Sequence, residues 1–265
     1  MLKRVITAVV LSAVTLCALL LGRYALWGLL LLAQVLCMWE MLSAAKIPSY
    51  RWVYLLYAAA LMPVTVYLGT MGAWLTVLLG VLAAFTVVTL RTEPDGNDLL
   101  RYVLPAVYPA VPMTALALLI GRESENWLLF LYLTLAVPIG CDTLALFIGK
   151  AFGKHKLIPA VSPNKTVEGA WGGVLGGMIG AFLVWLIAGV FLKKTVPALW
   201  IFLILGLFGA VFSEVGDLVG SYIKRVFSVK DFGKIFPGHG GMLDRLDSIL
   251  FSAVFMLCVL NIFPL

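Results

Sequence analysis

Charged side chains are scarce in this sequence. Asp, Glu, Lys and Arg make up 12% of its 265 residues, whereas hydrophobic residues make up 63%. A soluble domain has about 25% charged residues and less than half apolar residues, so the composition excludes a soluble globular protein. Because no stretch is polar enough for a separate soluble domain, we expect one membrane domain over residues 1–265. Within it, residues 1–126 carry no recognisable motif and residues 127–265 carry the polar loops.

Metal-binding and disulfide patterns of cysteine are also missing. The four cysteines lie inside apolar runs without a CxxC pair; they are Cys17, Cys37, Cys141 and Cys258. We interpret them as lipid-facing or core side chains, which excludes a zinc site and a disulfide framework.

Nine apolar runs fill most of the chain. Each is long enough, at about 1.5 Å per residue, to cross about 30 Å of hydrocarbon with some tilt. They are continuously apolar and lack the two-residue period of a membrane β-barrel. We therefore predict an all-α polytopic membrane protein with about nine transmembrane helices. The runs cover residues 5–21, 25–45, 52–68, 73–90, 102–120, 127–149, 169–192, 197–220 and 248–264.

Basic residues are unevenly distributed between the loops on the two sides of this scheme. Fifteen of the 19 Lys and Arg residues lie on the side of the amino terminus, and the other four are Arg23, Arg122, Lys193 and Lys194. Since basic loops stay in the cytoplasm, the amino terminus is predicted to be cytoplasmic. The polar loops 150–168 and 221–247 then both face the cytoplasm. The net charge of +6 fits either topology alone or attraction of anionic headgroups and nucleotides.

A carboxylate interrupts the sixth run. Asp142 follows Pro138, and insertion of an acidic side chain at such a depth costs about 2.5 to 3.5 kcal/mol. It therefore needs a wet cavity, a bound cation or an ion pair with a neighbouring helix.

The loop after the sixth run predicts an anion site. Ser162 and Pro163 suit the N-cap and first position of a helix, which would present free backbone amides beside Lys165. The glycines that follow at small-xxx-small spacing, from Gly169 to Gly180, indicate close helix packing and no chemistry.

The eighth run ends in a polar helix face. Glu214, Asp217, Ser221 and Lys224 are spaced three, four and three residues apart, which places them on one side of a helix.

The ninth run begins with a second such face. Asp244, Asp247 and Ser248 lie at its start, after the glycine-rich loop 237–241, whose amides can approach a phosphate closely. Carboxylates from several helices with basic residues around them are the groups that hold Mg²⁺ and the phosphates it bridges.

These segments resemble the signature of the CDP-diacylglycerol synthase family, also called phosphatidate cytidylyltransferases. The similar residues are Ser221-x-x-Lys224-Arg225, Lys230-Asp231 and Pro237-x-His239-Gly240-Gly241-x-x-Asp244-Arg245-x-Asp247, and upstream Gly153 to Leu157 and Ser162-Pro163-x-Lys165-Thr166-x-Glu168-Gly169. The resemblance covers the carboxy-terminal half, and the family fold agrees with nine helices. Leu144 and Leu146 depart from the residues common in the family around Asp142.

The resemblance implies cytidylyl transfer from CTP to phosphatidate, which gives CDP-diacylglycerol and pyrophosphate at a cell inner (plasma) membrane, with the active site facing the cytoplasm. It implies Mg²⁺ and a second, monovalent cation such as K⁺, with membrane lipids as partners and no nucleic acid. The expected metal ligands are Asp217, Asp244, Asp247 and Asp142. The expected catalytic residues are Asp217, Asp244, Asp247, Lys224 and Arg225, and the expected substrate-binding residues are Ser162, Lys165, Thr166, Ser221, Lys230, His239, Gly240, Gly241 and Arg245.

Two other functions can be compared with the sequence. A secondary transporter or ion-coupled carrier would use intramembrane carboxylates, and Glu40, deep in the second run, is the one placed where a midplane site is expected. A CDP-alcohol phosphotransferase would need an Asp-x-x-Asp-Gly-x-x-Ala-Arg motif, which the sequence lacks. The oligomeric state, with a homodimer among the options, stays open.

Overall fold

Helices make up almost all of the regular structure. The computed structural model describes residues 2–47, 50–90, 97–123, 126–193, 195–236, 238 and 240–263. Within these ranges, seven helices are long and apolar enough to cross a membrane. This confirms the all-α polytopic membrane fold, while the count of nine crossings stays a prediction.

The chain forms two compact units. The first comprises Met1–Arg122 and Phe227–Leu246, and the second comprises Glu123–Val226 and Asp247–Leu265. The first unit thus combines the amino-terminal helices with the polar segment that follows the eighth apolar run. The single membrane domain over residues 1–265 stays a prediction.

Five helices and the start of a sixth build the first unit. They follow the predicted apolar runs in order, with one short break between the fourth and the fifth helix. Their bounds are α1 (Leu2–Leu21), α2 (Arg23–Ala44), α3 (Arg51–Thr89), α4 (Asp98–Val107), α5 (Ala110–Gly121) and α9 (Leu243–Ile262), which continues into the second unit.

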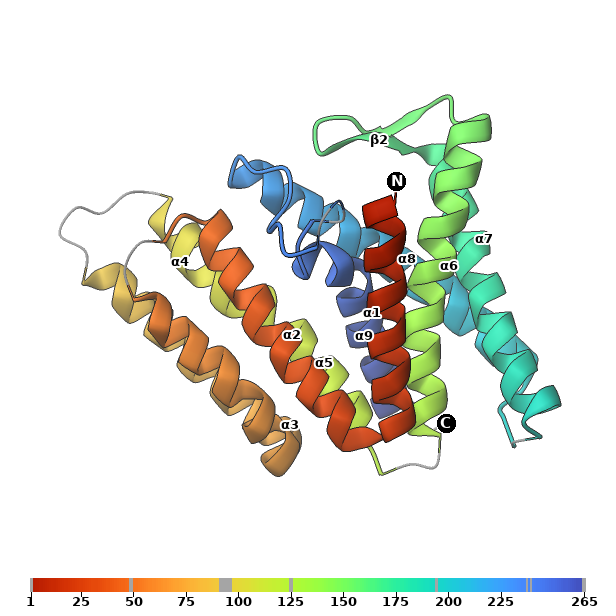
Figure 1. Ribbon diagram of the computed structural model, residues 1–265, viewed down its shortest axis with the longest axis horizontal. Coiled ribbons are helices and arrows are strands. Elements are labelled where there is room, and N and C mark those ends of the chain that lie inside the picture. The colour runs from red at the N-terminus through yellow and green to blue at the C-terminus, as the bar shows by residue number, and fades with distance from the viewer. Residues whose placement is uncertain are drawn as a thin grey trace. The chain divides into compact units, whose positions relative to one another are not determined.

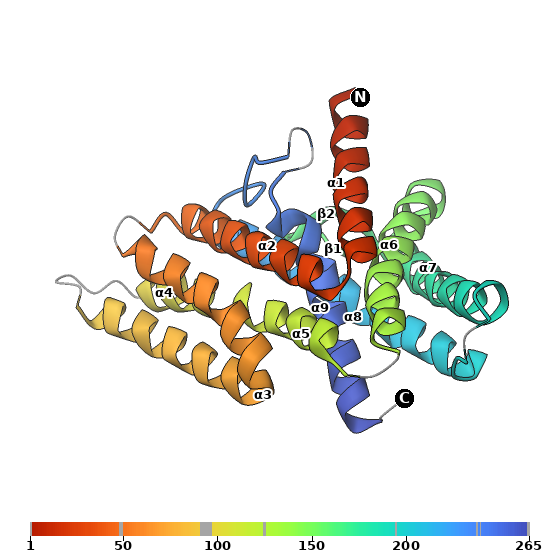
Figure 2. The same ribbon diagram turned by 60° about the horizontal axis from the view of Figure 1, so that its bottom comes forward.

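The 39-residue helix α3 is a helical hairpin. Gly69 has φ +62° and ψ −145°, a conformation that glycine adopts without a steric penalty, and it separates two helical halves. Figure 1 and Figure 2 both show α3 folding back on itself at this point. The halves pack closely, since a Cβ at Gly80 would collide with the ring of Tyr57. Two of the nine predicted runs, 52–68 and 73–90, are therefore the two halves of α3.

Tyrosine hydroxyls join α3 to α4. The hydroxyl of Tyr54 donates to the carbonyl of Tyr102 at 2.8 Å, and that of Tyr57 donates to the carbonyl of Ala106 at 2.9 Å. Each bond pairs a polar atom that would otherwise be costly to bury in an apolar environment.

Three long helices, a short ribbon and most of α9 build the second unit. The helices are α6 (Trp127–Phe152), α7 (Val167–Leu186), which ends in the π-helical turn η1 (Ile187–Phe191), and α8 (Leu199–Val226). The ribbon between α6 and α7 consists of β1 (Lys156–Ile158) and β2 (Ser162–Thr166), paired antiparallel. Figure 1 shows it where α6 ends and α7 begins.

Glycines allow α6, α7 and α8 to approach one another closely. A Cβ at Gly140 on α6 would collide with the carbonyl oxygen of Gly176 on α7, and a Cβ at Gly177 would meet the side chain of Ala210 on α8. The predicted role of the glycine stripe in helix packing is confirmed.

The predicted helix start at Ser162 is wrong. Ser162 pairs with Ile158 and Thr166 pairs with Lys156, so these residues are extended rather than helical. The helix begins at Val167, and its N-cap is Thr166, whose Oγ1 accepts a hydrogen bond from the amide of Gly169 at 3.1 Å. Both Ser and Thr are good N-caps. Because Ser162 is paired with β1 in the ribbon, the N-cap of α7 is Thr166.

Candidate functional site

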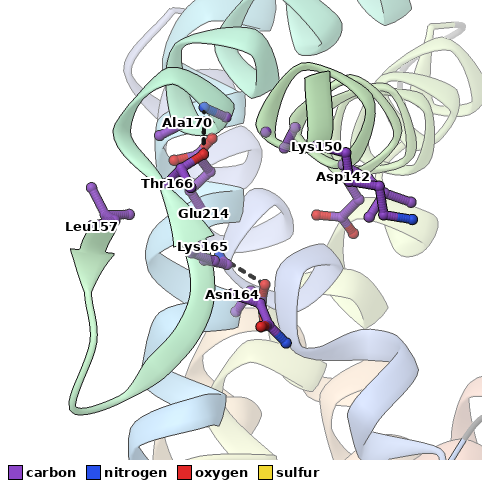
Figure 3. A pocket seen from close by; sticks show the side chains of 13 residues that line it. Asp142, Lys150, Leu157, Asn164, Lys165, Thr166, Ala170 and Glu214 are labelled. Carbon is purple, nitrogen blue, oxygen red and sulfur yellow. Dashed lines mark hydrogen bonds and ion pairs between the residues drawn. The ribbon is translucent and has the colours of Figure 1, made fainter. Parts of the chain in front are cut away.

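A pocket lies in the second unit, where α6, α7, α8 and the ribbon meet. It has a volume of about 620 Å³ and contains Asp142, Glu214 and Asp217 together with Lys150 and Lys165. Figure 3 shows Asp142, from α6, across the pocket from Lys165, from β2. Ligand pockets typically measure about 300–1,000 Å³, and the volume of this pocket lies within that range.

Lys165 and Asp217 form an ion pair inside this pocket. The Lys165 Nζ lies 2.7 Å from Asp217 Oδ2, and the two side chains are 25% and 30% exposed. Ser221, one turn further along α8, donates a long hydrogen bond of 3.5 Å to Asp217 Oδ1. The predicted helix face on α8 is thus turned towards the ribbon, where Lys165 supplies the positive charge.

Asp247 is the buried carboxylate at the start of α9 within the second unit. Its Oδ1 accepts a hydrogen bond from the Ser248 amide at 2.9 Å, and its Oδ2 lies 3.9 Å from the Nζ of Lys224. The negative charges of Asp217 and Asp142 also repel a negative charge on Asp247. The neighbouring Ser248 hydroxyl donates to Asp142 Oδ2 at 3.5 Å, which connects α9 with α6.

The ribbon is held by charged and polar contacts on both sides. The carboxylate of Glu168 accepts hydrogen bonds from the amides of Lys154 and His155 and lies 2.7 Å from His155 Nδ1. At the end of α8, Arg225 Nε donates to the carbonyl of Val161 at 3.2 Å. Lys165 and Thr166 therefore lie on a short element fixed at both ends.

Asp244 belongs to the first unit, and its carboxylate holds the loop that precedes α9. Oδ2 accepts hydrogen bonds from the amides of Phe232 and Gly241, both at 2.9 Å. Gly240 has φ +84°, and a Cβ there would come within 2.9 Å of the same oxygen. This contact gives Asp244 a loop-holding role, and its predicted role as a metal ligand stays a prediction.

Three other predicted residues, in this loop and in the first turn of α9, are at the surface or outside the described part of the chain. Lys230 and Arg245 are exposed, and His239 lies outside the described residues.

The donor atoms of the second unit suit a hard divalent cation. Carboxylate oxygens of Asp142 and Asp217 share the pocket, and Asp247 adds a third negative charge within electrostatic range. Mg²⁺ takes oxygen ligands and commonly uses one or two carboxylates together with substrate phosphates. Among the described residues, no group of three or more His, Cys, Asp or Glu side chains is arranged as a complete metal site. The oxygen donors of the pocket are thus of the kind that Mg²⁺ takes, and the binding of Mg²⁺ stays a prediction.

Sequence reasoning left three polar pocket residues out of the predicted site: Lys150, Asn164 and Glu214. Glu214 lies three residues before Asp217 on the same helix face, so its spacing already indicated it. Its Oε1 lies 3.7 Å from the Sγ of Cys141, a contact between α8 and α6 that no spacing rule predicts. All four cysteines are free thiols in the structure.

The chain is similar to known proteins along its whole length. The profile of the "Cytidylyltransferase family" matches residues 2–263. The phosphatidate cytidylyltransferase of Brucella abortus is 32% identical over 263 residues, which cover 96% of this chain and 90% of the relative. Those of Staphylococcus saprophyticus and Bacillus subtilis are 45% identical over 129 residues and 42% identical over 144 residues. In these two alignments the chain spans about half the length of the relatives, 46% and 52%.

Proposed function

Because the chain belongs to the cytidylyltransferase family, we propose that it transfers a cytidylyl group from CTP to phosphatidate, giving CDP-diacylglycerol and pyrophosphate. The observation that supports this most strongly is the pocket of the second unit, where carboxylates and Lys165 lie around one space of nucleotide size. The name that its relatives share specifies the same reaction.

The pocket residues fit the needs of this reaction. A phosphate oxygen of phosphatidate would form a bond to the α-phosphorus of CTP while the bond to the β-phosphate oxygen breaks. A phosphate is an adequate nucleophile, so positioning and charge neutralisation carry the catalysis, without a strong general base. Lys165 is placed to bind a phosphate once the substrate competes with Asp217 for its ammonium group.

Asp142, Asp217 and Asp247 are the residues that would hold Mg²⁺, which when bound supplies positive charge to neutralise the phosphates. Charge balance supports this role. Both substrates are anions, and the pocket region contributes several carboxylates against Lys150, Lys165 and Lys224. A second cation such as K⁺ and a homodimer stay predictions.

The chain is a membrane protein, and we propose that its amino terminus and the pocket face the cytoplasm of a cell inner (plasma) membrane, where CTP is available. The proposal rests on the distribution of Lys and Arg between the loops. The transporter alternative has no support from the family or the relatives.

Incubation of the purified protein in detergent with phosphatidate, Mg²⁺ and α-labelled CTP tests the proposed reaction. We expect label in a lipid-soluble product that matches CDP-diacylglycerol, with one pyrophosphate released per product. Omission of phosphatidate should abolish both products, and EDTA should abolish them until Mg²⁺ is added back. Pyrophosphate release that does not depend on phosphatidate would refute the assignment.

A further inference from the structure

Glu40 is a buried acidic residue that the proposed chemistry does not use. It lies on α2 within the first unit, and its side chain is only 2% exposed. Its Oε1 accepts a hydrogen bond from the amide of Met242 and its Oε2 accepts one from the amide of Leu243, both at 2.9 Å. The two partners are about 200 residues away in the sequence and form the beginning of α9. Glu40 therefore caps the N-terminus of another helix.

This contact suits the chemistry of both sides. The first amides of a helix have no intrahelical partner and carry partial positive charge, so an acidic group beside them is stabilising. A carboxylate with both oxygens occupied by backbone amides also satisfies the demand that a buried polar group be hydrogen-bonded.

The loop before α9 is shaped to receive the Glu40 side chain. A Cβ at Gly233 or at Gly241 would collide with the Glu40 carboxylate, so both positions depend on the absence of a side chain. The loop is fixed from its other side by Asp244, which accepts hydrogen bonds from the amides of Phe232 and Gly241. The Phe232 ring is buried and lies 6.4 Å from that of Tyr108, measured between centroids.

We propose that Glu40 is a positioning residue for substrate binding: together with Asp244 it holds Gly241 and the first turn of α9, the helix that also carries Asp247 of the proposed metal site, in the conformation that CTP binding requires. This inference rests on the proposed function, because the loop and that turn carry Lys230, Gly240 and Arg245 of the expected substrate-binding set. The same inference assigns a function to the amino-terminal helices, which carry no recognised motif.

Replacement of Glu40 by Gln tests the proposal in the full-length protein in detergent. Glutamine keeps the size and one acceptor oxygen but presents an NH₂ group to the second amide. Loss of one charge-assisted hydrogen bond is expected to have about a tenfold effect or more. We expect the amides of Met242 and Leu243 to exchange with deuterium at least about tenfold faster, and the affinity for labelled CTP in Mg²⁺, measured by equilibrium binding, to fall about tenfold.

A matched control comes from the same helix. Gln34 is also buried, at 1% exposure, and its Nε2 has no hydrogen-bond partner among the described residues. Gln34→Met should leave CTP affinity and the exchange of the α9 amides within about twofold of wild type, because it alters α2 without altering the cap.

A second variant approaches the contact from the loop. Gly233→Ala places a methyl group against the Glu40 carboxylate without changing α2. If both variants act through the same contact, the double variant should lose no more CTP affinity than the single variant with the larger loss. Independent effects on affinity would multiply instead. This comparison also serves if Glu40→Gln is poorly folded, since Gly233→Ala alone must then raise amide exchange and lower CTP affinity.

Unchanged CTP affinity in both variants would overturn the positioning role, as would unchanged exchange at Met242 and Leu243. A purely structural role would lower thermal stability and yield while the folded fraction kept its CTP affinity, and this result would also overturn the proposal. A wild-type protein that binds CTP but makes no CDP-diacylglycerol would instead refute the proposed reaction, and the affinity measurements would still decide the role of Glu40.

Discussion

Asp247 offers the sharpest test of the proposed metal site. The change Asp247→Asn keeps the size of the side chain and removes one negative charge. In the folded protein that charge lies 3.9 Å from the Nζ of Lys224, and the two side chains are only 8% and 13% exposed. At this distance the attraction is about 4 kcal/mol with an effective dielectric constant of about 20.

The same charge is repelled by Asp217 and Asp142. Removal of the charge therefore loses the attraction to Lys224 and relieves the repulsion by two carboxylates. These two effects on the free energy of unfolding oppose each other. We expect the melting temperature in detergent to stay within about 4 °C of wild type, a change of about 1 to 2 kcal/mol for a protein of this size.

Activity should respond much more strongly than stability. If Asp247 helps to hold Mg²⁺, the loss of its charge weakens the neutralisation of the phosphates in the transition state. We predict that kcat for CDP-diacylglycerol formation falls at least about 100-fold, or about 2.7 kcal/mol, and that more Mg²⁺ is needed for half-maximal rate. The measurement is product formation over a Mg²⁺ titration.

Asp231 provides the matched control, because it is an exposed acidic residue of the neighbouring loop. Asp231→Asn should stay within about threefold of wild type, as expected for a solvated surface charge. Near wild-type turnover in Asp247→Asn, or a larger loss at Asp231, would refute the choice of carboxylates.

Three further predictions follow from the ion pair, the topology and the helix packing. Lys165→Ala should raise the KM for CTP or phosphatidate or lower kcat, while yield stays near wild type because its partly exposed ion pair contributes about 1 kcal/mol or less; unchanged kinetics for both substrates would make Lys165 structural. In a cysteine-free background, a cysteine at Ser228 should be labelled from the cytoplasm and one at Thr195 from outside, and labelling of both from one side would refute the topology. Gly140→Ala should lower stability in detergent by about 1 to 3 kcal/mol, since the new methyl meets a carbonyl oxygen of α7, whereas Gly28→Ala, with nothing within 4 Å, should not; equal melting temperatures would contradict the packing.

Much of the fold and part of the candidate site could be predicted because they follow from local periodicity. The spacing of Asp217 and Ser221 placed both on one face of α8, and the structure turns that face towards Lys165. The small-xxx-small glycines likewise predicted close helix packing, and the structure shows which helices are involved, α6 and α7. In each case the evidence lies within one helical segment.

Features that depend on contacts distant in sequence could not be predicted in this way. Ser162 and Thr166 are both good N-caps, and the pairing of β2 with β1 decides between them. The capping of α9 by Glu40 joins residues about 200 positions apart, and the composition of α2 gives no sign of it.

The first turn of α9 shows why residue type alone could not separate the roles of neighbouring carboxylates. Asp244 and Asp247 are one helical turn apart, and by spacing they are equivalent candidates for a metal. Their surroundings differ, because Asp244 receives two backbone amides of the preceding loop whereas Asp247 lies beside the Lys224 ammonium and two other carboxylates. Backbone amides satisfy a carboxylate permanently, while like charges leave one in need of a cation. We therefore expect Mg²⁺ to depend on Asp247 directly and on Asp244 through the loop that it holds.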